Sequence, residues 1–384
     1  MKHQPDNLSV NDIKMFMEND WHIRPKLFRQ AFKHLEPLCD IDTILEMASD
    51  ENIESRFIQH HQQRYTLQHG PFDTLPNLNT PNWTVLIQGL ETVIPEAQDL
   101  LQQFRFIPDA RLDDIMLSLA SDQGGVGPHY DSYDVFLIQM HGKRRWQIGP
   151  LSDTSLVPNS PVKILQHFEP NQSFILEPGD MLYLPPNYGH HGEAIGICST
   201  ISVGFRAFSK SELLSHLLHD LADQVANDEQ LSKQLFSDPQ RGISDDCTEI
   251  PNDLIEFSQN CLIQFKPDHL TIQKCVGTLL SEPKSNVFFD SSQCENMSPE
   301  DIQLTFEKQG LSLALGCRML FLGNQLFMNG EAIQIESMEC LSILKKLAKT
   351  HELTANHAKN AFKNPEFRFL IIGFAKSGWL NCID

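Results

Sequence analysis

From about residue 115 to residue 206, short runs of β-branched and aromatic residues alternate with turns rich in glycine and proline. Strands this short, at this spacing, are typical of an all-β barrel or a jelly roll. The runs are IMLSLAS, YDVFLIQM, RRWQIG, SFILEPGDMLYLPP and CSTISVGF. We therefore predict a β-rich domain in the middle of the chain, with the other blocks arranged around it.

The first 115 residues mix helical and extended patterns. Helical periodicity is seen in TILEMASDENIESRFI and in NWTVLIQGLETVIPEAQDLLQQF, where the helical segment surrounds Pro95. The run RYTLQHGPF is typical of a strand that ends in a turn. We expect helical elements and loops on the N-terminal side of the barrel.

The chain becomes helical again after residue 209, beginning with SKSELLSHLLHDLADQVAND. Ser209 is the expected N-cap, and five leucines form one apolar stripe along the helix. These are Leu213, Leu214, Leu217, Leu218 and Leu221. Such a stripe belongs either to the core of the protein or to an interface with another chain.

The last part of the chain has its own pattern, after a region at 238–260 whose Asp, Pro and Ser content indicates a linker. RMLFLGNQLFMNG predicts a hairpin with a Gly-Asn turn. SMECLSILKKLAKTH predicts a helix, and EFRFLIIGFAKSGWL predicts a closing strand. Together they fit a small winged-helix-like module.

Composition and charge restrict the partners of the protein. The chain has 384 residues, of which 41% are hydrophobic and 21% charged, so two or three globular domains are expected. Its 50 acidic and 30 basic residues give a formal net charge of -20. Phosphate backbones repel such a protein, which disfavours direct nucleic-acid binding, whereas a basic protein partner is attracted.

Cysteine usage and the chain start indicate a cytoplasmic protein. The start, MKHQPDNLSVNDIKMF, has no apolar core of a signal peptide, and no apolar run reaches the length of a membrane span. No two cysteines form a CxxC pair, so zinc-ribbon and dithiol redox sites are excluded and reduced thiols are expected. The nine are Cys39, Cys198, Cys247, Cys261, Cys275, Cys294, Cys317, Cys340 and Cys382.

The stretch GGVGPHYDSYDVF carries the first candidate metal ligands. On a strand, residues two apart point to the same face, so His129 and Asp131 aim an imidazole and a carboxylate at one point. With sixteen histidines in the chain, such a pair also arises by chance. The later segment EPGDMLYLPPNYGHHG supplies a turn, a short strand and another histidine. Two histidines and one carboxylate form the facial set of non-haem Fe(II) oxygenases.

Three histidines compete for the third position. His141 lies in MHGKRR, which we expect to be a turn that reverses the strand after Asp131, at the far end from the site. His190 and His191 are adjacent, so their side chains point to opposite faces of a strand and only one can face the metal. The residues themselves leave this choice open.

The segments GGVGPHYDSYDVFLIQMHGKRRWQIG and PGDMLYLPPNYGHHG closely resemble the JmjC-type ribosomal oxygenases of the cupin superfamily. The similarity is to the bacterial class, which hydroxylates an arginine of a large-subunit ribosomal protein. It extends to DWHIRPKLF, HGPF, NWTVLIQ, RLDDIMLSLAS and ISVGFRA, and covers residues of about 15–208. Beyond that point it rests on the layout of the chain.

This resemblance implies an α+β protein in three parts. The first, 1–207, is a double-stranded β-helix (jelly roll) catalytic domain of the JmjC/cupin type with helical N-terminal elements. The second, 208–290, is a helical dimerisation region, which makes the leucine stripe an interface of a homodimer. The third, 291–384, is a winged-helix-like C-terminal domain.

The resemblance also implies the metal site. The third ligand in the family is the histidine four residues after the second proline, which is His190 here. Fe(II) is then held by His129, Asp131 and His190, with 2-oxoglutarate and dioxygen as cosubstrates. Relatives tend to have an acidic residue where this chain has His191, so the HHG sequence departs from the family at this position.

A cation has to bind the distal carboxylate of 2-oxoglutarate, and KRRW offers three. Along a strand Arg144 and Trp146 share one face, whereas Lys143 and Arg145 share the other. The family places its basic residue fifteen positions after the first histidine, which selects Arg144. A family serine that shares this carboxylate matches Ser118, whose other reading is an ordinary hydroxyl of the barrel.

Three functions follow from these observations. The first is hydroxylation of an arginine in a basic ribosomal protein. The second is hydroxylation of another residue such as histidine, because related oxygenases in other lineages act on it. The third is a non-redox cupin that serves as an interaction module, which predicts a broken triad or a missing anchor cation. Pocket shape, which separates the first two, is not visible in the sequence.

Overall fold

The computed structural model describes residues 5–33, 38–61, 64–243 and 248–383, so Cys247 lies outside the described residues. The chain divides into two compact units. The first combines residues 1–207, 284–317 and 346–384, and the second combines residues 208–283 and 318–345. None of the described helices is long and apolar enough to cross a membrane.

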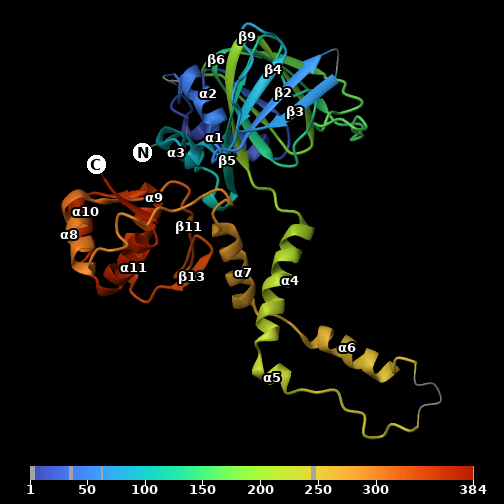
Figure 1. Ribbon diagram of the computed structural model, residues 1–384, viewed down its shortest axis with the longest axis vertical. Coiled ribbons are helices and arrows are strands. Elements are labelled where there is room, and N and C mark those ends of the chain that lie inside the picture. Colours follow the sequence, from blue (N-terminus) through green and yellow to red (C-terminus); the bar gives the residue numbers. More distant parts are fainter. Residues whose placement is uncertain (1–4, 34–37, 62–63, 244–247, 384) are drawn as a thin grey trace. The chain divides into compact units, whose positions relative to one another are not determined.

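A nine-stranded antiparallel sheet forms the centre of the first unit (Figure 1). Its strands follow the order β1-β8-β6-β9-β5-β4-β2-β3, and β7 pairs with β6. The long strands β6 and β9 pair from Asp134 opposite Phe205 to Pro150 opposite Tyr188. The strands are β1 (Lys26–Phe28), β2 (Ser55–His61), β3 (Arg64–His69), β4 (Trp83–Ile87), β5 (Leu112–Ala120), β6 (Asp134–Pro150), β7 (Gln172–Leu176), β8 (Met181–Leu184) and β9 (Tyr188–Phe205).

Short helices pack against this sheet. In the first of them, the Ser9 side chain accepts a hydrogen bond from the backbone of Asp12, whose carboxylate in turn accepts one from the Ser9 backbone. This capping box fixes the helix start, and Phe16 is buried against Phe136 and Tyr183 of the sheet. The helices are α1 (Val10–Asn19), α2 (Ile41–Ser49), η1 (Leu90–Thr92), α3 (Pro95–Gln102) and η2 (Asp109–Arg111).

The C-terminal segments of the first unit form a smaller layer of helices and strands. Its three-stranded sheet has the order β14-β10-β15, and helices pack beside it. The elements are α8 (Pro299–Gln309), β10 (Leu311–Leu313), β14 (Glu352–Leu353), α10 (Ala355–Ala361), α11 (Pro365–Lys376) and β15 (Leu380–Cys382). Helix α9 (Met338–Thr350) begins in the second unit and ends in the first.

Helices and a three-stranded sheet make up the second unit. Ser209 caps α4, because its side chain accepts a hydrogen bond from the Glu212 backbone, as predicted. The predicted hairpin is also present, with Gly323 at a positive φ in its turn. The elements are α4 (Lys210–Ala226), α5 (Glu229–Ser232), α6 (Asn252–Gln264), α7 (His269–Ser281), β11 (Met319–Leu322), β12 (Gln325–Met328) and β13 (Glu331–Gln334).

Four sequence predictions of local structure are wrong. The apolar run WTVLI, predicted to be helical, is strand β4 and is buried at every position. A run that is apolar throughout has no hydrophobic periodicity by which a strand could be distinguished from a helix. The end of TILEMASDENIESRFI belongs to strand β2, and the predicted closing strand is helix α11. Asn364 caps that helix, and Pro365 begins it. The predicted linker at 238–260 ends in helix α6.

The strand after Asp131 does not reverse at MHGKRR, so a fifth prediction of local structure is also wrong. Strand β6 continues through it, with register shifts on both sides of His141. Gly142 has φ 64 there, a left-handed conformation that lets the strand bulge and proceed. Because the strand continues, Arg144 lies on the same strand as the apolar run that follows Asp131.

Candidate metal centre

Three potential metal ligands meet at one end of the barrel. His129 and Asp131 lie in the segment before β6, and His190 is near the start of β9. The backbones of His129 and His190 exchange two hydrogen bonds of 2.9 and 2.8 Å. One ligand atom from each residue lies within 4.8 Å of the other two, a spacing that a single metal ion can bridge.

Backbone carbonyls orient both imidazoles. Nδ1 of His129 lies 2.9 Å from the carbonyl oxygen of Gly127, and Nδ1 of His190 lies 3.1 Å from that of Tyr188. Each Nδ1–H donates to its carbonyl, so each Nε2 keeps its lone pair for a metal ion. The Asp131 carboxylate is 3.6 Å from Nε2 of His190 and supplies the negative charge.

The structure separates the competing histidines. His190 is 2% exposed, and burial together with the neighbouring His129 lowers its pKa to about 4, which keeps the imidazole neutral. His191 points to the other face of β9 and is only partly buried. His141 is exposed on β6, away from the other two ligands. The geometry therefore brings His190 to the pair.

We expect Gly127→Ala to loosen the His129 side of the site. A Cβ at Gly127 would overlap with Cδ1 of Ile164 and would lie 3.0 Å from the Tyr65 ring, at φ +84. Overpacking and strain of this kind cost about 1–3 kcal/mol, so thermal unfolding should show a lower Tm and metal analysis a lower iron content. Gly196→Ala is the matched control, because Gly196 also has positive φ but open space around it. Equal losses in both variants would contradict this reading.

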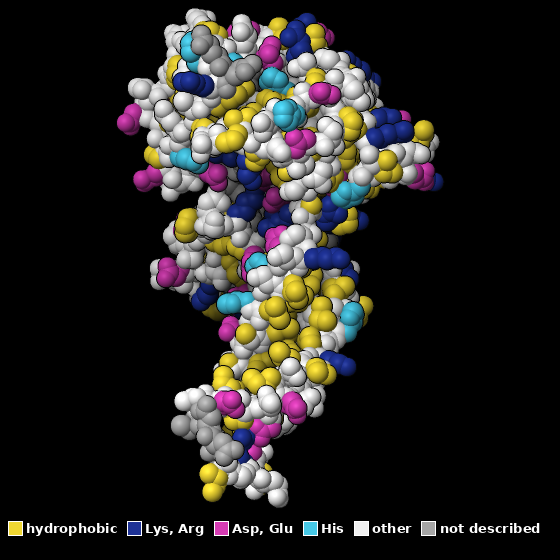
Figure 2. Space-filling model, turned by 90° about the vertical axis from the view of Figure 1, so that its right-hand side faces the viewer, with side chains coloured by type: hydrophobic (Ala, Val, Ile, Leu, Met, Phe, Trp, Pro, Cys, Tyr) yellow, Lys and Arg dark blue, Asp and Glu magenta, His cyan; other side chains and the backbone are white. Residues whose placement is uncertain are grey.

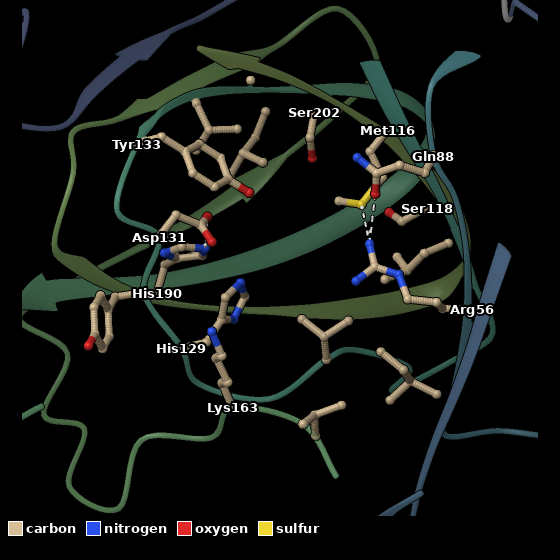
Figure 3. Close-up of a pocket in the computed structure, with 18 of the residues that line it drawn as sticks. Arg56, Gln88, Met116, Ser118, His129, Asp131, Tyr133, Lys163, His190 and Ser202 are labelled. Atoms are coloured by element: carbon tan, nitrogen blue, oxygen red, sulfur yellow. Dashed lines mark hydrogen bonds and ion pairs between the residues drawn. The ribbon is translucent and has the colours of Figure 1, made fainter. Parts of the chain in front are cut away.

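A cavity of about 510 Å³ opens beside the triad. Figure 3 shows His129, Asp131 and His190 on one side, with Arg56, Gln88 and Met116 opposite them. The Tyr133 side chain lies next to Asp131 in the same view, and Ser118 lies near Met116. The cavity therefore has a metal-binding side and a polar wall that faces it.

Arg144 also lines this cavity, and it is 5% exposed. Its Nη1 donates a 3.0 Å hydrogen bond to Oγ of Ser118. Nε and Nη2 are buried and have no hydrogen-bond partner among the described residues. A buried guanidinium with two unsatisfied nitrogens is costly unless an anion binds there.

The two neighbouring cations are arranged differently. Lys143 forms a 2.6 Å ion pair with Glu177, and Arg145 forms a 3.3 Å ion pair with Glu193. Both side chains are about half exposed and point away from the cavity face that Arg144 shares with Trp146. Only Arg144, among the three, can offer its charge to a ligand in the cavity.

Sequence reasoning missed the wall opposite the triad. Gln88 accepts a 2.7 Å hydrogen bond from Nη2 of Arg56 and donates one to the Asp114 carboxylate. Burial raises the pKa of Asp114 to about 6. Part of this wall was predictable from the alternation of side chains along strand β5. The cavity is lined by every second residue over this stretch, namely Asp114, Met116 and Ser118.

The amino-acid sequence is similar to those of known protein families and of a characterised enzyme. The JmjC domain family matches residues 99–213, and the ROXA-like winged helix family matches residues 265–381. The ribosomal protein uL16 3-hydroxylase of Escherichia coli K12 is 30% identical over 372 residues, which is 95% of this chain and 96% of that protein.

Two solved structures are similar over nearly the whole length. The X-ray structure of E. coli ycfD has a TM-score of 0.84 at 28% identity, and the match covers 99% of this chain and 100% of that one. The E. coli ribosomal oxygenase YcfD in complex with cobalt and 2-oxoglutarate has a TM-score of 0.77 at 28% identity, over 97% and 98% of the two chains.

Proposed function

Because this chain belongs to the ribosomal oxygenase family of JmjC proteins, we propose that it is an Fe(II)- and 2-oxoglutarate-dependent enzyme that hydroxylates an arginine of a large-subunit ribosomal protein. The predicted family and the predicted fold class of a JmjC domain with a winged-helix C-terminal domain are confirmed. The name of the Escherichia coli relative, ribosomal protein uL16 3-hydroxylase, supports a ribosomal protein as the partner. The formal net charge of -20 favours a basic partner, and we propose the cytoplasm as the place of reaction.

The observation that carries this proposal is the complete triad beside a buried, unsatisfied guanidinium. His129, Asp131 and His190 would hold Fe(II), because two histidines and one carboxylate are the ligand set of non-haem Fe(II) oxygenases. A bound Fe(II) would supply the oxidation chemistry, in which one oxygen atom of dioxygen hydroxylates a C–H bond of the substrate while 2-oxoglutarate becomes succinate and carbon dioxide. Nε and Nη2 of Arg144, with Oγ of Ser118, would bind the distal carboxylate of 2-oxoglutarate. A non-redox interaction module would need none of these groups.

The Asp114 carboxylate in the opposite wall favours arginine over histidine as the target. The Asp114 carboxylate reaches the cavity that the triad also lines. A guanidinium keeps its positive charge at every physiological pH, whereas a histidine of ordinary pKa is mostly neutral at pH 7. A carboxylate buried in this wall therefore pairs more strongly with an arginine side chain.

Mass spectrometry of ribosomal proteins tests the proposal directly. Proteins from a deletion strain, incubated with purified enzyme, Fe(II) and 2-oxoglutarate, should gain the mass of one oxygen atom on one arginine. Fragmentation of the modified peptide identifies the residue. If the added oxygen lies on a histidine, the protein is a histidine hydroxylase and not an arginine hydroxylase. If succinate is released but no ribosomal protein is modified, the enzyme acts on another substrate.

We also propose a homodimer formed by helices of the second unit. Leu214 and Leu218 on α4 are 56% and 57% exposed, whereas Leu221 is buried within its own chain. Figure 2 shows apolar side chains gathered over these helices. Exposed members on α6 and α7 include Ile255, Leu262, Ile263 and Leu270. Contiguous apolar surface of this kind is typical of an interface.

Replacing Leu218 with aspartate should convert the dimer to a monomer, because the carboxylate would be desolvated at the interface. Light scattering at micromolar concentration measures the mass. Leu304→Asp is the control, since Leu304 is 63% exposed on α8 of the first unit and should leave the mass unchanged. A monomeric wild-type protein at that concentration would end the dimer proposal.

A further inference from the structure

A lysine from a distant part of the sequence lies behind the cavity wall. Lys284 begins the segment 284–317, which belongs to the first unit. Its Nζ lies 3.0 Å from Oε1 of Glu91 and 3.6 Å from Oδ2 of Asp114, and its side chain is 20% exposed. Oε2 of Glu91 accepts a 2.8 Å hydrogen bond from the Ile115 backbone, which fixes Glu91 beside β5. One cation is thus held between two largely buried carboxylates.

The Asp114 carboxylate has two different sides. Oδ2 receives the Gln88 side-chain amide and lies near Lys284. Oδ1 has no hydrogen bond within the part of the chain that the structure describes. Gly204 keeps the approach to Oδ1 open, because a Cβ at that position would lie 3.0 Å from this oxygen. Gly204 also lines the cavity, so Oδ1 is available to a ligand there.

We propose that Lys284 is a positioning residue that keeps Asp114 negatively charged and directed into the cavity, where Oδ1 receives the cationic side chain of the substrate. This inference rests on the proposed function, which supplies the basic substrate. Lys284 itself does not touch the reacting atoms. It acts from behind the wall, through the side of the carboxylate that the substrate does not use.

The charges around Asp114 explain why a lysine is needed. Burial raises the pKa of Asp114 to about 6, and among the neighbours Lys284 has the largest effect, which opposes that rise. Glu91 and Asp113 raise the pKa further, and the hydrogen bond from Gln88 lowers it. Without Lys284, burial and two like charges act with little opposition, so the carboxyl becomes protonated near neutral pH. A neutral carboxyl no longer attracts a guanidinium as an ion pair.

The test compares Lys284→Met and Lys284→Arg with the wild-type enzyme on an arginine-containing peptide of the ribosomal substrate. The dependence of kcat/KM on pH reports the pKa values of the free enzyme. An opposite charge within this distance lowers an Asp pKa by about one unit or more. We therefore expect the acid limb of kcat/KM, near pH 6 in the wild type, to move up by about one unit or more in Lys284→Met.

Three further readouts separate positioning from a general structural role. At neutral pH the peptide KM of Lys284→Met should rise about 2- to 10-fold, as expected when most of the carboxyl becomes protonated. The peptide KM of this variant should return towards the wild-type value at alkaline pH, where the Asp114 carboxyl is ionised again. The KM for 2-oxoglutarate should stay unchanged, and Lys284→Arg should restore the wild-type profile. Lys346→Met, at an exposed lysine, is the matched control.

Glu91→Gln is an independent variant that should shift the acid limb of kcat/KM in the opposite direction. It removes a charge that raises the pKa of Asp114 but keeps an oxygen for the Ile115 backbone, so the acid limb should move to lower pH. The inference would be overturned if the dependence of kcat/KM on pH were unchanged in both variants. It would also be overturned if kcat/KM fell by the same factor at every pH and the KM for 2-oxoglutarate rose as well. A wild-type enzyme that leaves the peptide unmodified would overturn the proposed function, and the inference with it.

Discussion

The Arg144→Ala variant is expected to raise the KM for 2-oxoglutarate by about 30- to 1000-fold. The guanidinium is buried, and two of its nitrogens lack partners among the described residues, so a bound carboxylate would satisfy both. Its removal leaves the distal carboxylate of the cosubstrate unpaired in a desolvated cavity. Loss of such a charged partner costs roughly 2–4 kcal/mol, which corresponds to that range of affinity. Initial rates over a 2-oxoglutarate titration measure the effect.

Two controls make this result specific. Arg145→Ala should change the KM for 2-oxoglutarate far less, because Arg145 faces outward and pairs with Glu193. Iron content of Arg144→Ala should stay near the wild-type level, since Arg144 is not one of the metal ligands. Small and equal effects of the two substitutions would place the anchor elsewhere in the cavity, which Arg56 and Lys163 also line.

Asp131→Ala should abolish substrate-dependent succinate formation while the protein still folds. Asp131 is the only carboxylate of the triad, so its loss removes both a ligand and the charge that balances the metal. His129→Ala and His190→Ala should have the same effect, because two remaining ligands hold Fe(II) weakly. Succinate release with the peptide substrate, iron content and the circular dichroism spectrum are measured together.

His191→Ala separates the two adjacent histidines. We expect it to retain most activity and iron, because His191 lies on the other face of β9 from His190. If His191→Ala loses iron and His190→Ala keeps it, the assignment is reversed. Normal activity in Asp131→Ala would contradict the triad as a whole.

Alternation along strands made much of the site predictable. The parity that groups Arg144 with Trp146 is a local property of an extended strand, and the structure has this arrangement. His129 and Asp131 lie in the segment before β6 and not on the strand, although their ligand atoms still meet. The choice of His190 over His191 needed the family resemblance, because strand alternation shows only that the two side chains point to opposite faces. The metal and cosubstrate roles of these residues, and the division at 207 and 290, stay predictions.

The remaining features depend on contacts between distant parts of the chain. No local pattern links Lys284 to Asp114, because their proximity follows from tertiary packing. The same cause explains the errors in secondary structure. Strand β4 is buried at every position, so its sequence lacks the alternation of a half-exposed strand. Helix α11 is rich in aromatic and branched residues that favour strands, yet Asn364 and Pro365 begin a helix.

The assembly of the first unit from three separate segments has a consequence for the order of synthesis. Ribosomes add about 5–20 residues per second from the N-terminus. The sheet is complete once residue 207 has been made, but Lys284 follows roughly 4 to 15 seconds later at that rate. Until then, Glu91 and Asp114 face each other without their lysine. If Lys284 positions Asp114 as proposed, a nascent barrel is expected to bind basic side chains poorly until the segment that begins at Lys284 has been translated.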